Sequence, residues 1–419
     1  MSEVEQITID VPEGTILSKN ITLPYDCKVN GINQNIMVLG NAMDGVERHF
    51  ISPNIKQGSS NFIITDKGGS MFYEYSAELE AMGYSVKKID LVDCLSNVTY
   101  DPFHYVRKKD DSRTCRDLCD FGYVEDICKL VKTIVKYTVD ASCEYFAKIE
   151  EDIFVILMLF EYLAENNPSF CGFLSRLHNI TSSIHAVSEI RELSKDVAEM
   201  CSDKQCKTII GRINTYSDKA IESILVSLEY DMACFYFYNK RCPMKNDTLN
   251  LDEYFDTKCA LFISCSLNDS FCKPLLGLII EQAADFLYRP CLPEYNRPAN
   301  YMNRFIVNAA DIIFTTELMD IIQTSSYSNM SFCIITGAFF QLGNEPIRTN
   351  IISYCDSILT LGILAIDDAI KLSTFAAKYR PVGQQTGMTS SQIMKKTASE
   401  CFVFINGYCV KKDKKYDSV

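Results

Sequence analysis

The chain has 419 residues, of which 47% are hydrophobic, and its formal net charge is −13 at pH 7. This length exceeds what one hydrophobic core usually holds, so we expect two domains or one domain with a large insertion. The acidic balance argues against a general nucleic-acid-binding protein, because neutralised phosphates supply most of the affinity of such proteins. The basic clusters are short and adjoin Asp residues, which predicts a solvated surface. A local basic pore remains an open alternative. The clusters are Arg107-Lys108-Lys109 and Lys411-Lys412 with Lys414-Lys415.

The nineteen Cys lie scattered within apolar runs, and Met1–Asp10 is acidic and does not resemble a signal peptide. This pattern predicts reduced thiols in a cytoplasmic protein. The closest pairs, Cys115/Cys119 and Cys201/Cys206, are not CxxC motifs and have no His at zinc spacing, so we expect no metal site. No stretch reaches the roughly 18–20 apolar residues that span a bilayer. We therefore expect no direct membrane insertion and, at most, attachment to a membrane through a partner.

The first hundred residues alternate short β-type runs with helical segments. We predict strands at Asn35–Leu39, Phe62–Thr65 and Tyr84–Leu91, and a helix at Phe72–Ala81 that stops at Gly83. Strand, helix and strand in this order indicate a parallel sheet with helices on both faces.

Residues 104–250 read as helical, because apolar residues recur there at helical spacing. The α/β pattern then resumes, with a predicted helix at Leu275–Leu287. We expect one α/β domain, made of residues 1–103 and 251–419, split by an all-helical insertion of residues 104–250. The tail Lys411–Val419 is charged, and we expect it to be frayed. The later predicted strands are Ala260–Cys265, Phe305–Asn308, Phe332–Thr336, Ser357–Leu361 and Cys401–Ile405.

The strand at Ile36–Leu39 leads into a loop with the glycine spacing of a phosphate-binding P-loop, Gly40 to Gly45. Such a loop needs Lys and then Ser or Thr after its second glycine, to hold phosphate and magnesium. Here those positions are Val46 and Glu47, and Asp44 adds a carboxylate inside the loop. The loop should therefore repel phosphate, and by itself the spacing indicates only a tight turn after a strand.

From Thr15 to Tyr416 the chain resembles the conjugative coupling proteins of type IV secretion, the TraG/TraD-like DNA-transfer ATPases, in the form common in Gram-positive conjugative elements. No single motif is diagnostic, but the order and spacing of the series follow the family. The matching stretches are Leu17-Ser18-Lys19-Asn20, Val38-Leu39-Gly40, Ser52-Pro53-Asn54, Ile64-Thr65-Asp66-Lys67-Gly68-Gly69, Gly83-Tyr84-Ser85-Val86, Tyr100-Asp101-Pro102-Phe103, Ser223-Ile224-Leu225-Val226-Ser227-Leu228, Cys355-Asp356 and Asp413-Lys414-Lys415-Tyr416-Asp417.

The resemblance implies a RecA-like P-loop NTPase fold, with a mostly parallel sheet, helices on both faces and a large all-α inserted domain. It also implies hexamers that pump single-stranded DNA and recruit relaxosome or protein substrates at the inner face of the membrane. Family members usually begin with two membrane helices, and we expect that anchor to be missing here, because few residues precede the first core strand.

The departures from the family fall on its catalytic positions. The Walker B acids correspond to Asn308 and Ala309, with Asp311 too far along to replace them. The arginine-bearing segment corresponds to Ser325–Asn329, where Ser326 and Ser328 stand without an Arg, and a γ-phosphate-sensing Gln corresponds to Gly337. An arginine finger alone contributes about 10³–10⁵ in rate. We therefore expect no ATP hydrolysis, with ATP and magnesium binding lost or weak and Gly40, Gly45 and Asp66 left as a vestigial nucleotide site.

None of the four His lies in a recognisable catalytic motif: His49, His104, His178 and His185. Three hypotheses follow. The first is a non-catalytic pseudo-ATPase that acts as an interaction, adaptor or regulatory component in conjugation, with an intact coupling protein, secretion or relaxosome components, or itself as partner. The second is a nucleotide- or single-stranded-DNA-binding module without efficient hydrolysis. The third is a scaffold with a role outside DNA transfer, since fold does not fix function.

Overall fold

The computed structural model describes residues 14–25, 31–108, 122–138, 144–266, 271–292, 295–362, 364–378, 388–408 and 410–417. Lys109, the Cys115/Cys119 pair and the acidic segment Met1–Asp10 lie outside these residues.

A nine-stranded sheet forms the centre of the α/β part, with the strand order β11-β10-β9-β3-β8-β7-β4-β6-β5. The seven strands from β9 to β5 run parallel, and β10 pairs antiparallel with both β9 and β11. The strands are β3 (Ile36–Leu39), β4 (Asn61–Lys67), β5 (Ser85–Asp90), β6 (Cys259–Cys265), β7 (Asn303–Asn308), β8 (Met330–Thr336), β9 (Ser357–Thr360), β10 (Glu400–Ile405) and β11 (Lys411–Lys414). All eight strands predicted from the sequence are found in this sheet.

Helices cover both faces of the sheet, so the central strands β3, β8 and β6 are apolar along most of their length. All seven residues of β6 are buried. Alternate residues of β3 enter two separate cores: Ile36 and Val38 face one, and Met37 and Leu39 face the other.

The first core lies under α2 (Ser52–Lys56) and α3 (Ser70–Ala81). The second lies under α12 (Lys273–Tyr288), α13 (Thr316–Thr324), α14 (Glu345–Tyr354), α15 (Ile366–Lys378) and α16 (Ser390–Met394). The helix predicted at Phe72–Ala81 is α3, and the chain turns after it at Gly83, which has a positive φ of 85°. The short helix α11 (Glu253–Asp256) leads into β6.

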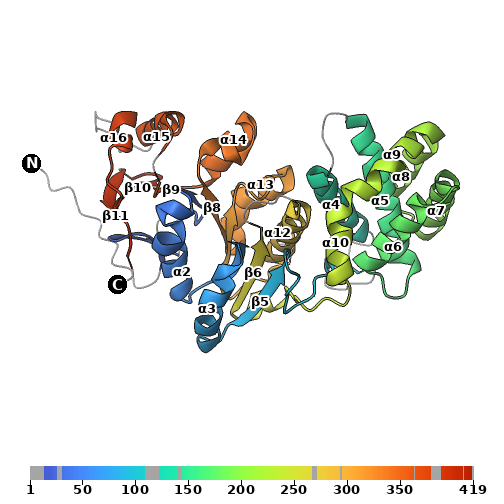
Figure 1. The fold of residues 1–419 in the computed structure, drawn as a ribbon, viewed down its shortest axis with the longest axis horizontal. Coiled ribbons are helices and arrows are strands. Elements are labelled where there is room, and N and C mark those ends of the chain that lie inside the picture. Colours follow the sequence, from blue (N-terminus) through green and yellow to red (C-terminus); the bar gives the residue numbers. More distant parts are fainter. Residues whose placement is uncertain are drawn as a thin grey trace, which may run out of the picture.

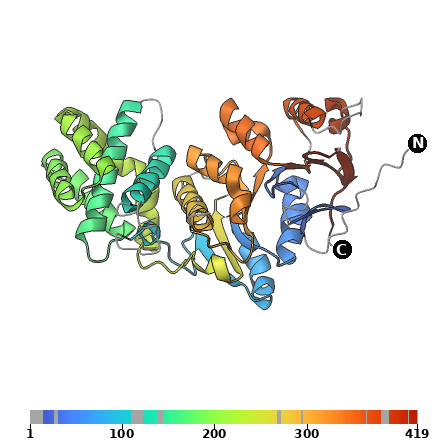
Figure 2. The same cartoon turned by 180° about the vertical axis from the view of Figure 1, so that it is seen from behind.

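Between β5 and β6 the chain forms a helical domain beside α12 and the β5 end of the sheet (Figures 1 and 2). Its first helix, α4, buries a stripe that includes Val124, Ile127, Val131 and Ile134. Because α4 packs along α12, the second core continues from the sheet into the helical domain. The helices are α4 (Gly122–Thr138), α5 (Glu144–Ala164), α6 (Phe170–Thr181), α7 (Ala186–Met200), α8 (Lys204–Thr215), α9 (Asp218–Asp231) and α10 (Ala233–Arg241). Among all helices of the described ranges, none combines the length and apolar character that a membrane crossing requires.

Two features of the chain ends were not predicted. A hairpin of β1 (Gly14–Ser18) and β2 (Ile21–Pro24) precedes the sheet. The expectation of a frayed tail is wrong for residues 411–417. β11 pairs with β10, and Asp413 accepts hydrogen bonds from the Ser18 hydroxyl (2.6 Å) and from the Asn20 backbone N–H (2.9 Å). The charged tail is held because its charges have partners on the hairpin, which local composition does not reveal.

Candidate functional site

The carboxyl ends of the seven parallel strands meet at one edge of the sheet, where ligands bind in open α/β folds. The loop Gly40–Glu47 follows β3 at this edge. Asp66 and Lys67 end β4, Asn308 ends β7, and Gly337 follows β8. The topology therefore gathers most of the residues singled out in the sequence: Gly40, Gly45, Val46, Glu47, Asp66, Asn308, Ala309 and Gly337.

The loop after β3 is folded on itself, and its backbone amides are engaged by its own groups. The N–H of Asn41 donates to Oδ2 of Asp44 (2.9 Å), and the N–H of Met43 donates to Oδ1 of Asn41 (3.0 Å). The N–H of Asp44 donates to the Asn41 carbonyl and that of Gly45 to the Ala42 carbonyl, both at 3.0 Å. These bonds form a reciprocal cap on the one-turn helix η1 (Ala42–Asp44). The Asp44 carboxylate thus accepts a loop N–H of the kind that a phosphate accepts in a P-loop.

Val46, at the position of the P-loop lysine, does not face the carboxyl edge. Its side chain is 3% exposed and belongs to the first core, below the loop. Gly45 adopts a left-handed backbone, with φ of 76°, and the His49 ring lies so close that a Cβ on Gly45 would be 2.6 Å from it. Nδ1 of His49 lies 2.6 Å from the Tyr416 carbonyl oxygen. Packing from both sides therefore fixes the loop in its folded form.

Carboxyl groups flank the loop. Burial raises the pKa of Glu47, and the negative charges of Glu74 and Asp66 raise it further. Asp66 is buried and accepts the N–H groups of Met71 (3.1 Å) and Phe72 (3.0 Å), so it caps α3. Burial raises its pKa despite these two bonds. Both shifts have the sign expected where carboxyl groups are desolvated near one another.

The end of β7 holds no exposed acid. Oδ1 of Asn308 accepts the N–H of Ala310 (3.0 Å), and Ala309 is buried. Asp311 is buried and forms an ion pair with Lys67, whose Nζ lies 3.3 Å from its Oδ1. Asn308 therefore stabilises its own turn, and the nearest carboxylate is already paired with a cation.

At the end of β8, the structure brings in a residue that the sequence analysis did not consider. Oε1 of Gln341 accepts the N–H of Gly337 and the hydroxyl of Thr336, both at 2.9 Å. The side chain of Gln341 thus lies beside Gly337, the position that the resemblance aligns with a γ-phosphate-sensing Gln, although Gln341 is four residues further along the chain. The helical turn η6 (Phe339–Leu342) folds it back, which sequence spacing alone does not show.

Ser326 and Ser328 are not part of this edge. They lie in the one-turn helix η5 (Ser325–Ser328), which comes directly before β8 and therefore at the opposite edge of the sheet. Ser328 is buried and Ser326 is exposed.

The C-terminal part of the chain supplies two lysines that the sequence analysis assigned to a solvated tail or passed over. Nζ of Lys415 donates to the Asp44 carbonyl (3.0 Å), and Nζ of Lys396 donates to the Thr360 carbonyl (2.9 Å). Burial lowers the pKa of Lys396 to about 8, and the positive charge of Lys415 lowers it further. The repeated Lys-Lys pairs near the C-terminus were the available signal, but only the pairing of β11 with β10 places Lys415 beside the loop.

The four His do not gather in one site. His49 contacts the loop, His104 lies where the chain enters the helical domain, and His178 and His185 lie in that domain. Within the described ranges, no group of three or more His, Cys, Asp or Glu side chains is placed to hold a metal ion.

Residues 30–302 match the family described as "Type IV secretory system Conjugative DNA transfer". None of the curated protein sequences matches the chain significantly. Among solved structures, the chain is similar to the bacterial conjugative coupling protein TrwBdeltaN70 in complex with sulphate, at 12% identity and a TM-score of 0.69, covering 98% of this chain and 91% of that one. TrwB in complex with ADP and Mg²⁺ matches at 10% identity and a TM-score of 0.63, covering 98% and 91%. VirB4 of Thermoanaerobacter pseudethanolicus matches at 12% identity and a TM-score of 0.55, covering 98% of both chains.

At these identities the structural likeness shows the fold alone. The fold is the RecA-like P-loop architecture with a helical domain, as the resemblance implied.

Proposed function

Because this chain belongs to the type IV secretion conjugative DNA-transfer family, we propose that it is a coupling-protein-like component that does not hydrolyse ATP and that acts through contacts with other proteins. Its partners would be an intact coupling protein, secretion or relaxosome components, or a second copy of itself. It would work in the cytoplasm, and at a membrane only where a partner holds it there.

The self-capped loop carries this proposal. A triphosphate needs free amides in the loop, a lysine above them and an acid at the end of the Walker B strand. In this chain the amides of Asn41, Met43, Asp44 and Gly45 have partners inside the loop, and Val46 is buried in the core. The residues present therefore do not fit ATP with magnesium, and we derive no catalytic step through them.

The electrostatics of the site point the same way. Asp44 lies in the loop, Glu47 follows it, and Asp66 ends β4 at the same edge of the sheet and acts electrostatically on Glu47. Two like unit charges about 4 Å apart repel by about 4 kcal/mol at an effective dielectric constant near 20. The ammonium of Lys415 offsets part of this repulsion, but it is already bonded to the loop carbonyl.

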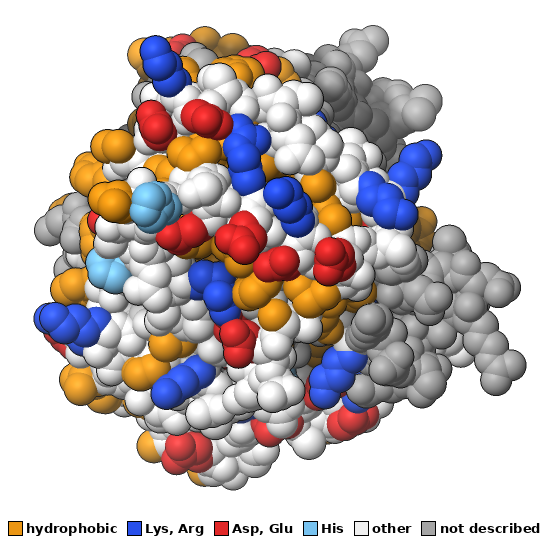
Figure 3. All heavy atoms as spheres, turned by 90° about the vertical axis from the view of Figure 1, so that its right-hand side faces the viewer, with side chains coloured by type: hydrophobic (Ala, Val, Ile, Leu, Met, Phe, Trp, Pro, Cys, Tyr) orange, Lys and Arg blue, Asp and Glu red, His pale blue; other side chains and the backbone are white. Residues whose placement is uncertain are grey.

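The helical domain offers a surface for protein contacts. Figure 3 shows hydrophobic side chains interspersed with charged ones on the outer face of this domain. Ile184 is 93% exposed, and Val226 and Tyr230 are each 83% exposed. Ile184 and Val226 line a hollow of about 490 Å³ between the α6–α7 turn and α9. Large apolar side chains at this exposure, rimmed by charges, are typical of sites where proteins interact.

The catalytic part of the proposal is tested by ATP turnover. Purified protein with magnesium and ATP should release phosphate no faster than its Met43→Asp variant, in which an exposed loop side chain becomes a carboxylate, and Mg-ATP should not raise its thermal midpoint. The proposal fails if the wild type hydrolyses ATP and the activity is lost in Met43→Asp or Asn308→Ala.

The interaction part is tested by co-purification with an intact coupling protein of the same secretion system. We expect a complex that Val226→Asp weakens. Ser223→Asp serves as the control, because it also adds one negative charge to α9 but replaces an exposed polar side chain. Retention of the complex by both variants would exclude this face as the contact.

A further inference from the structure

A second cavity lies at the junction of the two domains, away from the loop after β3. It has a volume of about 600 Å³, within the range of small-molecule sites. Its walls come from the chain entering the helical domain (residues 104–108), from Asp252 on the returning chain, from the end of α12 and from residues 295–297. A molecule bound here would contact segments at both crossings between the domains.

The cavity is cationic in a chain that is acidic as a whole. Among its described lining residues, four side chains are cationic and one, Asp252, is a carboxylate. The cations are Arg107, Lys108, Arg289 and Arg297. Such a concentration of guanidinium groups is suited to phosphate, which arginine binds with two parallel hydrogen bonds.

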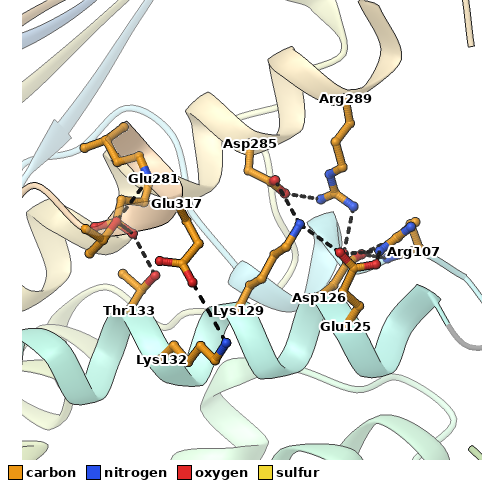
Figure 4. Close-up of polar contacts among 12 residues, drawn as sticks. Arg107, Glu125, Asp126, Lys129, Lys132, Thr133, Glu281, Asp285, Arg289 and Glu317 are labelled. Atoms are coloured by element: carbon orange, nitrogen blue, oxygen red, sulfur yellow. Dashed lines mark hydrogen bonds and ion pairs between the residues drawn. The ribbon is translucent and has the colours of Figure 1, made fainter. Parts of the chain in front are cut away.

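Carboxylates behind the cavity, of which Asp126 is buried, hold two of the arginines in place (Figure 4). Asp126 accepts Nη2 of Arg107 at 2.8 Å and Nη1 of Arg289 at 2.7 Å. Asp285 also pairs with Arg289, and Glu125 with Arg107. These three carboxylates line a neighbouring cavity of about 410 Å³ and do not line the cationic one. Arg107 and Arg289 line both cavities, so the larger cavity meets these two arginines without their carboxylates.

Donor capacity remains on this wall. Nε of Arg289 is buried and has no hydrogen-bond partner among the described residues. Because Nε is covered, an anion in the cavity would instead accept from Nη1 and Nη2 of Arg289, each of which gives one of its two hydrogens to a carboxylate, Asp126 and Asp285 respectively.

Aromatic rings complete the cavity. Tyr105 and Phe286 meet edge to face, with ring centroids 5.1 Å apart, and Tyr295 lines the same space. Arg297 stacks over Phe255 at 4.3 Å and pairs with Asp252 and Asp256, both at 3.2 Å, and these contacts fix its guanidinium plane. Aromatic and guanidinium planes are the surfaces on which nucleobases stack.

From these observations we propose that this junction cavity binds a nucleoside phosphate, with the phosphate on Arg289, Arg297 and Lys108 and the base against the aromatic rings. The group can come from a free nucleotide or from the phosphorylated end of a single strand. The site is separate from the loop after β3, so it needs neither ATP hydrolysis nor a working P-loop.

Equilibrium dialysis of the full chain without magnesium tests the proposal, with AMP, ATP, a short 5′-phosphorylated oligothymidylate and inorganic phosphate as probes. We expect AMP or ATP to bind with a submillimolar dissociation constant. If the nucleoside phosphate belongs to the end of a strand, we expect such binding for the oligothymidylate alone. Arg297→Ala should weaken binding about 10- to 100-fold, the loss expected for hydrogen bonds to a charged group. Lys108→Ala should weaken it several-fold, and Arg297→Lys should lie between the wild type and Arg297→Ala.

Arg241→Ala is the matched control, because Arg241 also stacks on a phenylalanine, Phe237, at 4.3 Å, but lies outside the cavity. It should bind like the wild type, as should Met43→Asp, which adds a carboxylate to the loop after β3 at a side chain that is 99% exposed. Thermal midpoints of all variants check that they are folded. If Arg297→Ala does not fold, Lys108→Ala still tests the proposal, because Lys108 is exposed.

The proposal is overturned if neither nucleotide nor the oligothymidylate binds at millimolar concentration, or if Arg297→Ala and Lys108→Ala bind like the wild type. Inorganic phosphate binding as tightly as AMP would reduce the cavity to a simple anion site and also overturn it. Loss of binding in a folded Met43→Asp variant would place the nucleotide at the loop after β3. That result would contradict this inference and also the proposed loss of nucleotide binding at the P-loop.

Discussion

Replacing Val46 by lysine restores the P-loop residue in the sequence but not in the structure. The Val46 side chain is 3% exposed, and its Cγ2 lies 3.1 Å from the position that a Cβ on Gly40 would occupy. Val46→Lys forfeits the burial of a valine, about 1.5–3 kcal/mol, and forces the ammonium either to stay in the core or to open the loop. We therefore expect the free energy of unfolding to fall by about 2–4 kcal/mol, without any gain of ATP binding.

Urea denaturation followed by circular dichroism measures this loss, and hydrogen exchange of the β3 amides reports the sheet separately from the helical domain. Val226→Lys is the control: it makes the same chemical change at a residue that is 83% exposed, and it should alter stability by less than about 0.5 kcal/mol. If Val46→Lys is as stable as the wild type, and Mg-ATP raises its thermal midpoint, then Val46 faces the ligand side of the loop and our account of the site is wrong.

Three further predictions concern side chains that join distant parts of the chain. Asp413→Ala removes the acceptor that ties the tail to Ser18 and should cost about 1–3 kcal/mol in urea denaturation, whereas Asp417→Ala, in an exposed ion pair, should cost less than about 1 kcal/mol. Burial raises the pKa of Glu281 to about 8, so the folded state retains a proton that the unfolded state loses at lower pH. Stability should therefore fall as pH rises from about 5 to about 8, and Glu281→Gln should flatten this dependence of the thermal midpoint. Asp126→Ala leaves two arginines without their shared carboxylate and should cost about 3–5 kcal/mol, with faster protease cleavage at the domain junction.

Each of these predictions has an outcome that contradicts it. Equal losses for Asp413→Ala and Asp417→Ala would mean that the tail is not anchored. An unchanged pH profile in Glu281→Gln would show that this carboxyl ionises normally in the folded protein. Wild-type stability in Asp126→Ala would show that the ion pairs at the junction do not hold the domains together.

The sequence determined the order and kind of most elements, because their signals are local. Short apolar runs marked every predicted strand, and helical spacing marked α4 and α9. The hairpin β1–β2 escaped prediction because its two strands are only five and four residues long. The strand β11 escaped prediction because it is a run of charged residues, and pairing with β10 and the bond from Ser18 to Asp413 hold it in place.

The candidate site was also predicted only in part from the sequence. The residue types at Val46, Glu47, Asn308 and Ala309 are visible in the sequence, and they predict lost ATP chemistry without any coordinates. Which groups occupy the site in their place depends on tertiary contacts. Asp44 satisfies the N–H of Asn41 only because the loop closes into a helical turn, and Lys415 reaches that loop only because β11 is added to the sheet edge.

The junction cavity is decided by tertiary structure alone. Its cations come from segments more than a hundred residues apart in the chain, Arg107 and Lys108 on one side and Arg289 and Arg297 on the other. Sequence analysis judged the first cluster to be solvated surface, because neighbouring Asp residues dilute its charge locally. In the folded protein the carboxylate of Asp126 is buried and does not line the cavity, whereas the guanidinium groups do. The local sequence thus determines which helices and strands form and which catalytic groups are missing. Long-range packing determines which charged side chains line the junction cavity.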